Sequence, residues 1–151
     1  MAGQGTNTAV ASGTQLPEFS CQQEAEAALF AWRDEALVAL LADVGAVLKF
    51  DFSGKSLKRL EAWFLGNGRP EFAAAGCSVP HAIGFYLGQI FRRTGGFAWM
   101  VQESPSMPRR YEIGVKRPHL AIMLTRGERP SPHDSARKHA LWRRWKRYVD
   151  R

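Results

Sequence analysis

The most strongly patterned stretch of the chain covers residues 80–101. Its first part has apolar residues at helical spacings of three and four, and Pro80 is suited to a first helical turn. The pair Gly95 and Gly96 predicts the end of this helix, because glycine adopts the left-handed conformation at a helix C-terminus with little strain. The aromatic and apolar run at 97–101 then predicts a buried strand. We expect the rest of the chain to be arranged around this helix and strand.

A second helix is expected from about residue 20 to about residue 43. Its apolar residues form one wide stripe, and Ser20 is suited to the N-cap. Gly45 is expected to interrupt this helix, and the short apolar segment 47–52, bounded by Gly45 and Gly54, predicts a strand. The stripe consists of Ala25, Ala28, Leu29, Trp32, Ala36, Leu37, Leu40 and Leu41.

A third helix is predicted between a serine cap and a glycine stop. Ser53 or Ser56 can cap it, and the Gly-Asn-Gly sequence at 66–68 ends it. Its apolar residues are Leu57, Leu60, Trp63 and Phe64, and its expected solvent-facing residues are Lys58, Arg59 and Glu61. The Ala-rich connector that follows, at 69–79, carries no clear pattern.

The segment 109–115 predicts a half-buried strand, since Tyr111, Ile113 and Val115 alternate with polar or small residues. We expect it to pair in a hairpin with residues 97–103 across a turn rich in proline and serine. Residues 120–124 form a continuous apolar run that fits a strand or a helix. Pro118 before this run and Gly127 after it favour a short helix over 119–126.

The C-terminal segment predicts a helix that is both basic and aromatic. Asp134 is suited to cap it, and Leu141, Trp145 and Tyr148 fall on one face. Two interpretations of this helix stay open. Its aromatic face docks on the domain and leaves the bases in solvent, or the helix contacts a partner with both its bases and its rings.

These elements predict an α+β fold, with a small antiparallel sheet packed against several helices and a basic C-terminal helix. A length of 151 residues suits one domain with one core. We expect a disordered leader at 1–17, a single α+β domain at 18–128, and a linker with the basic aromatic helix at 129–151. The sequence shows no pattern typical of a signal peptide and no run approaching ~20 apolar residues. The two cysteines lack a metal-ligand spacing, and a cytoplasmic protein is expected.

Three stretches resemble a family of small uncharacterised bacterial proteins that is common in actinomycetes: DFSGKSLKRLE at 51–61, YLGQIFRRTGGFAW at 86–99 and RPHLAIMLTRGE at 117–128. The corresponding residues are Asp51, Phe52, Ser53, Ser56, Leu57 and Leu60, then Leu87, Gly88, Gly95, Gly96 and Trp99, and then Pro118 and Gly127. The resemblance covers residues 47–128 and implies a compact α+β domain with a helix at 119–126. Family members commonly have an acid where this chain has Gln89. The resemblance implies an architecture and no mechanism.

Charge is distributed unevenly along the chain. The formal net charge is +7, and residues 133–151 alone contribute seven bases against two acids. Such a skew points to an anionic partner where the bases form one contiguous surface. The candidate binding residues are Arg92, Arg93, Arg109, Arg110, Arg137, Lys138, Trp142, Arg143, Arg144, Trp145, Lys146 and Arg147.

No catalytic or metal-binding constellation is visible in the sequence, and no cofactor is expected. Phosphate loops of the Walker kind, nucleophile elbows and paired histidine or cysteine spacings are all missing. Asp51 is more simply explained as a cap of the following helix than as a catalytic acid, and Gly84 and Gly88 as points of close packing.

The favoured function is therefore a non-catalytic interaction protein that binds another protein, as an adaptor, a regulator or an immunity-like binder. The alternative is a nucleic-acid-binding protein that uses the C-terminal helix. Contact of this helix with an anionic membrane surface is a further possibility for the same residues.

Overall fold

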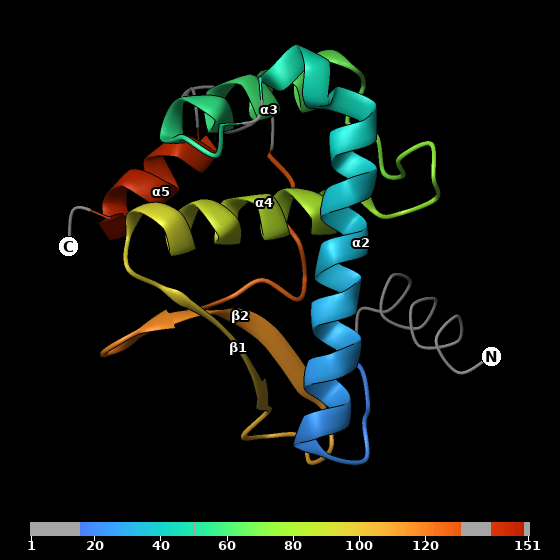
Figure 1. The fold of residues 1–151 in the computed structure, drawn as a ribbon, viewed down its shortest axis with the longest axis vertical. Helices are drawn as coiled ribbons and strands as arrows, with labels where there is room; N and C mark the ends of the chain where they lie inside the picture. Colours follow the sequence, from blue (N-terminus) through green and yellow to red (C-terminus); the bar gives the residue numbers. More distant parts are fainter. Residues whose placement is uncertain (1–15, 50, 131–139, 150–151) are drawn as a thin grey trace.

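A computed structural model describes residues 16–49, 51–130 and 140–149, and these form four helices and a three-stranded antiparallel sheet (Figure 1). The fold is therefore α+β, as the sequence predicts. In chain order the elements are α2 (Gln22–Leu48), α3 (Gly54–Gly66), α4 (Val79–Thr94), β1 (Ala98–Glu103), β2 (Tyr111–Arg117), β3 (Leu120–Met123) and α5 (Ala140–Val149).

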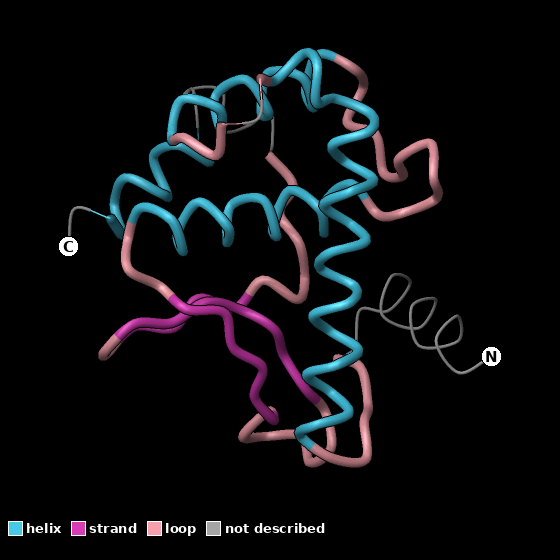
Figure 2. Tube along the Cα trace, in the orientation of Figure 1, coloured by secondary structure: helices cyan, strands magenta, loops and turns pink. Residues whose placement is uncertain are grey.

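Helix α4 is the centre of the core, which confirms the prediction for residues 80–94. Twelve of its residues are buried, and Pro80 occupies its first turn. A Cβ atom on Gly88 would lie 2.5 Å from both the Trp99 ring and the Leu124 side chain, so glycine is needed for α4 to approach these residues. Figure 2 shows α3, α4 and α5 on the same side of the sheet, with α2 running past both α4 and the sheet.

The predicted hairpin is confirmed. Strands β1 and β2 pair antiparallel from Ala98 opposite Lys116 to Glu103 opposite Tyr111. The alternation seen in the sequence matches the burial, because Tyr111, Ile113 and Val115 are all buried. Residue 114 must be glycine, since a Cβ atom there would collide with the backbone of Ile122 on β3.

The predicted helix at 119–126 is wrong, because Leu120–Met123 forms strand β3. It pairs with β2 from Arg117 opposite Leu120 to Gly114 opposite Met123. A strand here satisfies hydrogen-bonding groups of β2 that β1 does not reach, which a helix would leave unpaired. Pro118 and Gly127, which favoured a helix, instead occupy the turn before the strand and the segment after it; His119 beside Pro118 has a positive φ of 68°.

The predicted strand at 47–52 is also wrong. Helix α2 continues through Gly45 to Leu48, and Lys49 ends it with a φ of 47° and an N–H bond to the Gly45 carbonyl. A glycine inside a helix costs only about 1 kcal/mol relative to alanine, and the fully buried Val44 beside it contributes packing that outweighs this cost.

Two smaller expectations about helix α3 have different outcomes. The Ser53 hydroxyl caps the helix by accepting the Ser56 N–H at 3.3 Å, which confirms one of the two predicted caps. Glu61, expected to face solvent, is only 5% exposed. In α2 the N-cap is Cys21, and the predicted cap Ser20 instead donates to the Glu24 carboxylate.

Leu16 and Pro17, at the end of the leader expected at 1–17, pack against the folded chain. Leu16 and Pro17 are buried, and the Pro17 carbonyl accepts the Tyr111 N–H at 3.0 Å. The expected leader at 1–15 and the linker at 131–139 lie outside the described residues. Within the described part of the chain, no helix is long and apolar enough to cross a membrane.

Candidate interaction surface around helix α5

Helix α5 lies against α3 and the C-terminal end of α4, and its aromatic side chains hold it there. The ring of Trp145 lies directly on Gly54, where any Cβ atom would collide with it. Its indole N–H donates to the Thr94 hydroxyl at 2.8 Å. Leu141 is 4% exposed and belongs to the core. The aromatic face of this helix is therefore used inside the protein, which is one of the two interpretations left open by the sequence.

Cationic side chains reinforce the same contact. The Arg117 guanidinium donates to the carbonyls of Gly95 at 3.1 Å and Tyr148 at 2.6 Å, so it joins the end of α4 to the end of α5. The Lys58 ammonium lies 4.2 Å from the centre of the Trp142 ring. A cation over an aromatic face is attracted by the quadrupole of the ring.

The opposite side of α5 is a basic stripe. Arg143, Lys146 and Arg147 are all exposed, and their spacing of three and four sets them on one helical face. Arg144 is different, because it forms an ion pair with Glu128 and its side chain is 33% exposed. Helix α5 therefore has an apolar side on the domain and a cationic side in solvent.

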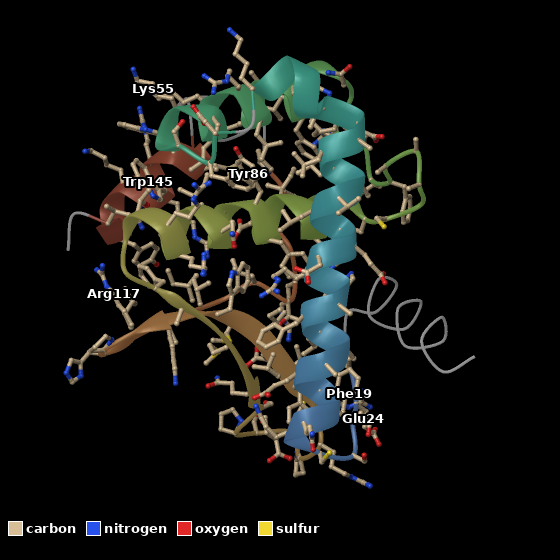
Figure 3. All side chains as sticks on the ribbon, viewed as in Figure 1. Phe19, Glu24, Lys55, Tyr86, Arg117 and Trp145 are labelled. Atoms are coloured by element: carbon tan, nitrogen blue, oxygen red, sulfur yellow. The ribbon has the colours of Figure 1, made fainter. Side chains whose placement is uncertain are left out.

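Tertiary contacts bring further cations beside this stripe. Lys55 follows Gly54, which the Trp145 ring contacts. Arg92 and Arg93 precede Thr94, which accepts the hydrogen bond from Trp145. We call the resulting surface the basic face; it consists of Lys55, Lys58, Arg92, Arg93, Arg117, Arg143, Lys146 and Arg147. Figure 3 shows Lys55, Trp145 and Arg117 along the same side of the molecule, on the left of the view.

Acidic side chains are scarce at this end. The described residues in the ranges 49–59, 92–93, 116–117 and 140–149 include twelve lysines and arginines and one carboxylate, Asp51. The hydroxyl and backbone N–H of Ser53 both donate to Asp51, and these bonds hold its pKa below the usual value. Asp51 therefore stays ionised and orders the turn before α3, but the residue that caps the helix is Ser53 and not Asp51 as expected.

Arg109 and Arg110 lie at the other end of the sheet, away from the basic face. Strand β2 has seven residues, from Tyr111 to Arg117, so its two ends are about 20 Å apart. Arg110 donates to the Leu16 carbonyl at 2.8 Å and lies 3.4 Å from the Glu18 carboxylate. We call this region the acidic end; its carboxylates are Glu18, Glu24, Glu26, Glu103 and Glu112.

The sequence-based candidates thus divide into three groups. The structure brings Arg92 and Arg93 together with the residues of α5, while Arg109 and Arg110 lie elsewhere. Arg137 and Lys138 are outside the described residues. Sequence reasoning missed Lys55, Lys58 and Arg117 because each is isolated in its own segment and joins the surface only through contacts with Trp142, Trp145 and Tyr148.

Two buried polar side chains elsewhere, Tyr86 and His81, have hydrogen-bonding neighbours. The Tyr86 hydroxyl lies 2.5 Å from the Ser56 hydroxyl, and burial raises the pKa of Tyr86, so the phenol stays protonated. His81 Nδ1 lies 2.7 Å from the Ser78 hydroxyl, and burial lowers the pKa of this imidazole. In the part of the chain that the structure describes, no group of three or more His, Cys, Asp and Glu side chains could hold a metal ion.

The fold and this surface define a small α+β protein with a strongly cationic end. Residues 18–149 match the family described as Uncharacterised protein YwmA, and the chain belongs to that family. Comparisons with curated proteins and with solved structures found no match.

Proposed function

We propose that this protein is a non-catalytic interaction protein whose basic face docks against an acidic surface of another protein. The observation that supports this most directly is the two-sided character of α5. Its aromatic rings are occupied by contacts with α3 and α4, and its exposed stripe is purely cationic. Exposed cations such as these can pair with the carboxylates or phosphates of a partner.

The composition of the basic face argues for recognition by charge. Among the described residues, the exposed large apolar side chains are Val38, Leu41, Phe72 and Met107, and none belongs to the basic face. Stable insertion into a membrane interface needs aromatic or aliphatic anchors on the contact side, so this arrangement disfavours a membrane role. We propose the cytoplasm of a bacterium, of the actinomycete type, as the setting.

A nucleic acid is the second candidate partner, and one observation favours it. The cations come from α3, α4, β2 and α5, so they cover an area wider than one helix, as contacts to successive phosphates require. Base stacking is not part of this proposal, since the Trp142 and Trp145 rings pack on Lys58 and Gly54.

One experiment separates the two partners. The full chain is titrated with poly-L-glutamate and with a short DNA duplex at several salt concentrations. The triple variant Arg143→Glu, Lys146→Glu and Arg147→Glu is measured beside it. A protein partner is supported by saturable binding to poly-L-glutamate that the variant loses. Tighter binding to the duplex, with a salt slope that falls by about one for each lost phosphate contact, supports the nucleic acid instead. Failure of both probes to bind at low salt would reject the basic face as a docking surface.

A further inference from the structure

A cleft lies at the other end of α3, away from the first turns that contribute to the basic face. Its volume is about 440 Å³, and it is lined by Phe64, Gly68, Arg69, Glu71, Arg129 and Pro130. The lining comes from the end of α3, the connector that follows it and the segment after β3. Two arginines and one glutamate at the cleft give it a net positive charge.

The backbone holds both arginines in place. The Arg69 N–H donates to the Phe64 carbonyl at 2.9 Å, and Arg69 has a positive φ of 54°. A non-glycine residue in this conformation is uncommon and needs support from its surroundings. Arg129 follows Glu128, whose N–H donates to the Pro80 carbonyl at 2.8 Å. These bonds fix the backbone at or beside both arginines, which lie on two different segments that line the cleft.

The charges within the cleft are only loosely paired. Arg129 Nε lies 3.5 Å from Glu71 Oε1, and both side chains are 56% exposed. Exposed ion pairs of this kind contribute little stability, so a competing anion can replace the carboxylate at small cost. Arg129 uses Nε for this contact, which leaves its terminal NH₂ groups to face a ligand. Arg69 is exposed, and its guanidinium has no ion pair among the described residues.

Two apolar residues, Phe64 and Pro130, form the packed base of the cleft. Phe64 is 2% exposed and Pro130 is buried, so both belong to the packed interior. His81 is buried near this cleft, and the charge of Arg129 adds to burial in lowering the pKa of the imidazole.

We propose that this cleft binds a small anion, with Arg69 and Arg129 holding its phosphate or carboxylate group. Guanidinium groups suit this task because their planar NH donors match two oxygens of one anionic group. Glu71 acts as the internal competitor, which occupies Arg129 when the ligand is absent. This site is independent of the basic face and of its proposed partners.

The test uses phenyl phosphate, benzoate and the neutral benzyl alcohol as probes of the full chain, with binding followed by NMR chemical shifts and by the rise in Tm. Phenyl phosphate or benzoate is expected to bind saturably with shifts at Gly68 and Arg69, and benzyl alcohol is not. Phenyl phosphate and benzoate distinguish a phosphate ligand from a carboxylate ligand.

Matched variants assign the contacts. Arg69→Gln and Arg129→Gln are each expected to weaken binding about tenfold, as loss of one charged hydrogen bond predicts. Glu71→Gln is expected to tighten binding, because it removes the competing carboxylate. Arg92→Gln, on the basic face, is expected to leave the Kd unchanged. The proposal is overturned if neither anion binds saturably, if Arg69→Gln and Arg129→Gln bind as tightly as the native chain, or if only Arg92→Gln loses binding.

Discussion

Basic residues at the acidic end of the sheet and on helix α5 have opposite surroundings. At the acidic end Arg110 bonds to the Leu16 carbonyl and lies beside the Glu18 carboxylate, so it fastens the N-terminal segment to the hairpin. On the basic face, Arg143, Lys146 and Arg147 are exposed on helix α5, whose other side packs against the domain. Arg110 is thus a structural tie, whereas we propose Arg143, Lys146 and Arg147 as docking groups.

The largest expected effect is on the basic face. Reversal of Arg143, Lys146 and Arg147 to glutamate is predicted to reduce affinity for a polyanionic partner at least 100-fold near 50 mM salt, because three attractive contacts become repulsive. The affinity is measured by fluorescence anisotropy. Arg109→Glu, at the acidic end, serves as the control and is expected to have little effect. Equal losses in both variants would mean that net charge, and not this surface, governs binding.

The next largest effect is on stability and concerns the contact of α5 with α3. Gly54→Ala is predicted to destabilise the protein by about 1–3 kcal/mol, since the new Cβ atom collides with the Trp145 ring and displaces the helix. The matched control is Gly66→Ala in the same helix, where a Cβ atom meets nothing within 4 Å. We expect the control to be neutral or stabilising by up to about 1 kcal/mol. Denaturant unfolding measures both, and similar losses would contradict the close contact of Trp145 with Gly54.

A third prediction separates the two uses of basic residues directly. Arg110→Ala is predicted to cost about 1–2 kcal/mol of unfolding free energy, because the Leu16 carbonyl loses its donor, with little effect on binding. Arg147→Ala is predicted to change stability by less than about 0.5 kcal/mol while weakening binding. Thermal unfolding and anisotropy are measured on the same samples. The distinction would be contradicted if Arg110→Ala weakened binding and Arg147→Ala lowered stability.

The smallest predicted effect is the change of protein stability with pH that comes from the buried His81. Burial keeps the pKa of folded His81 below its usual value, so in the unfolded chain this histidine takes up a proton that the folded protein excludes. Stability is therefore predicted to fall as pH decreases through about 6.5 and to level off below the folded pKa. His81→Gln should give a flatter profile between about pH 7 and pH 5 in urea unfolding. The Asp51 carboxyl, whose pKa is lowered, affects stability only at more acidic pH. An unchanged slope in the variant would exclude His81 as the source.

Both errors in the expected secondary structure arose where short segments depend on distant partners. Residues 120–124 are apolar enough for a helix or a strand. Pairing with β2, from Arg117 to Gly114, stabilises the strand. At 47–48 the helix continued because Gly45 costs less than the packing around Val44 contributes. Longer patterns were less ambiguous, since the stripes of α2 and α4 and the alternation in β2 involve many residues that agree.

By itself, the sequence determined the α+β class, the central α4 with its glycine stop, the β1–β2 hairpin and the two-sided character of α5. These follow from periodicity, which depends only on the geometry of a single element. Only the tertiary structure decided that Lys55, Lys58 and Arg117 join α5, that Arg110 lies at the opposite end, and that Arg69 and Arg129 share a cleft. Those residues are far apart in the chain, and their proximity results from how the helices and the sheet pack.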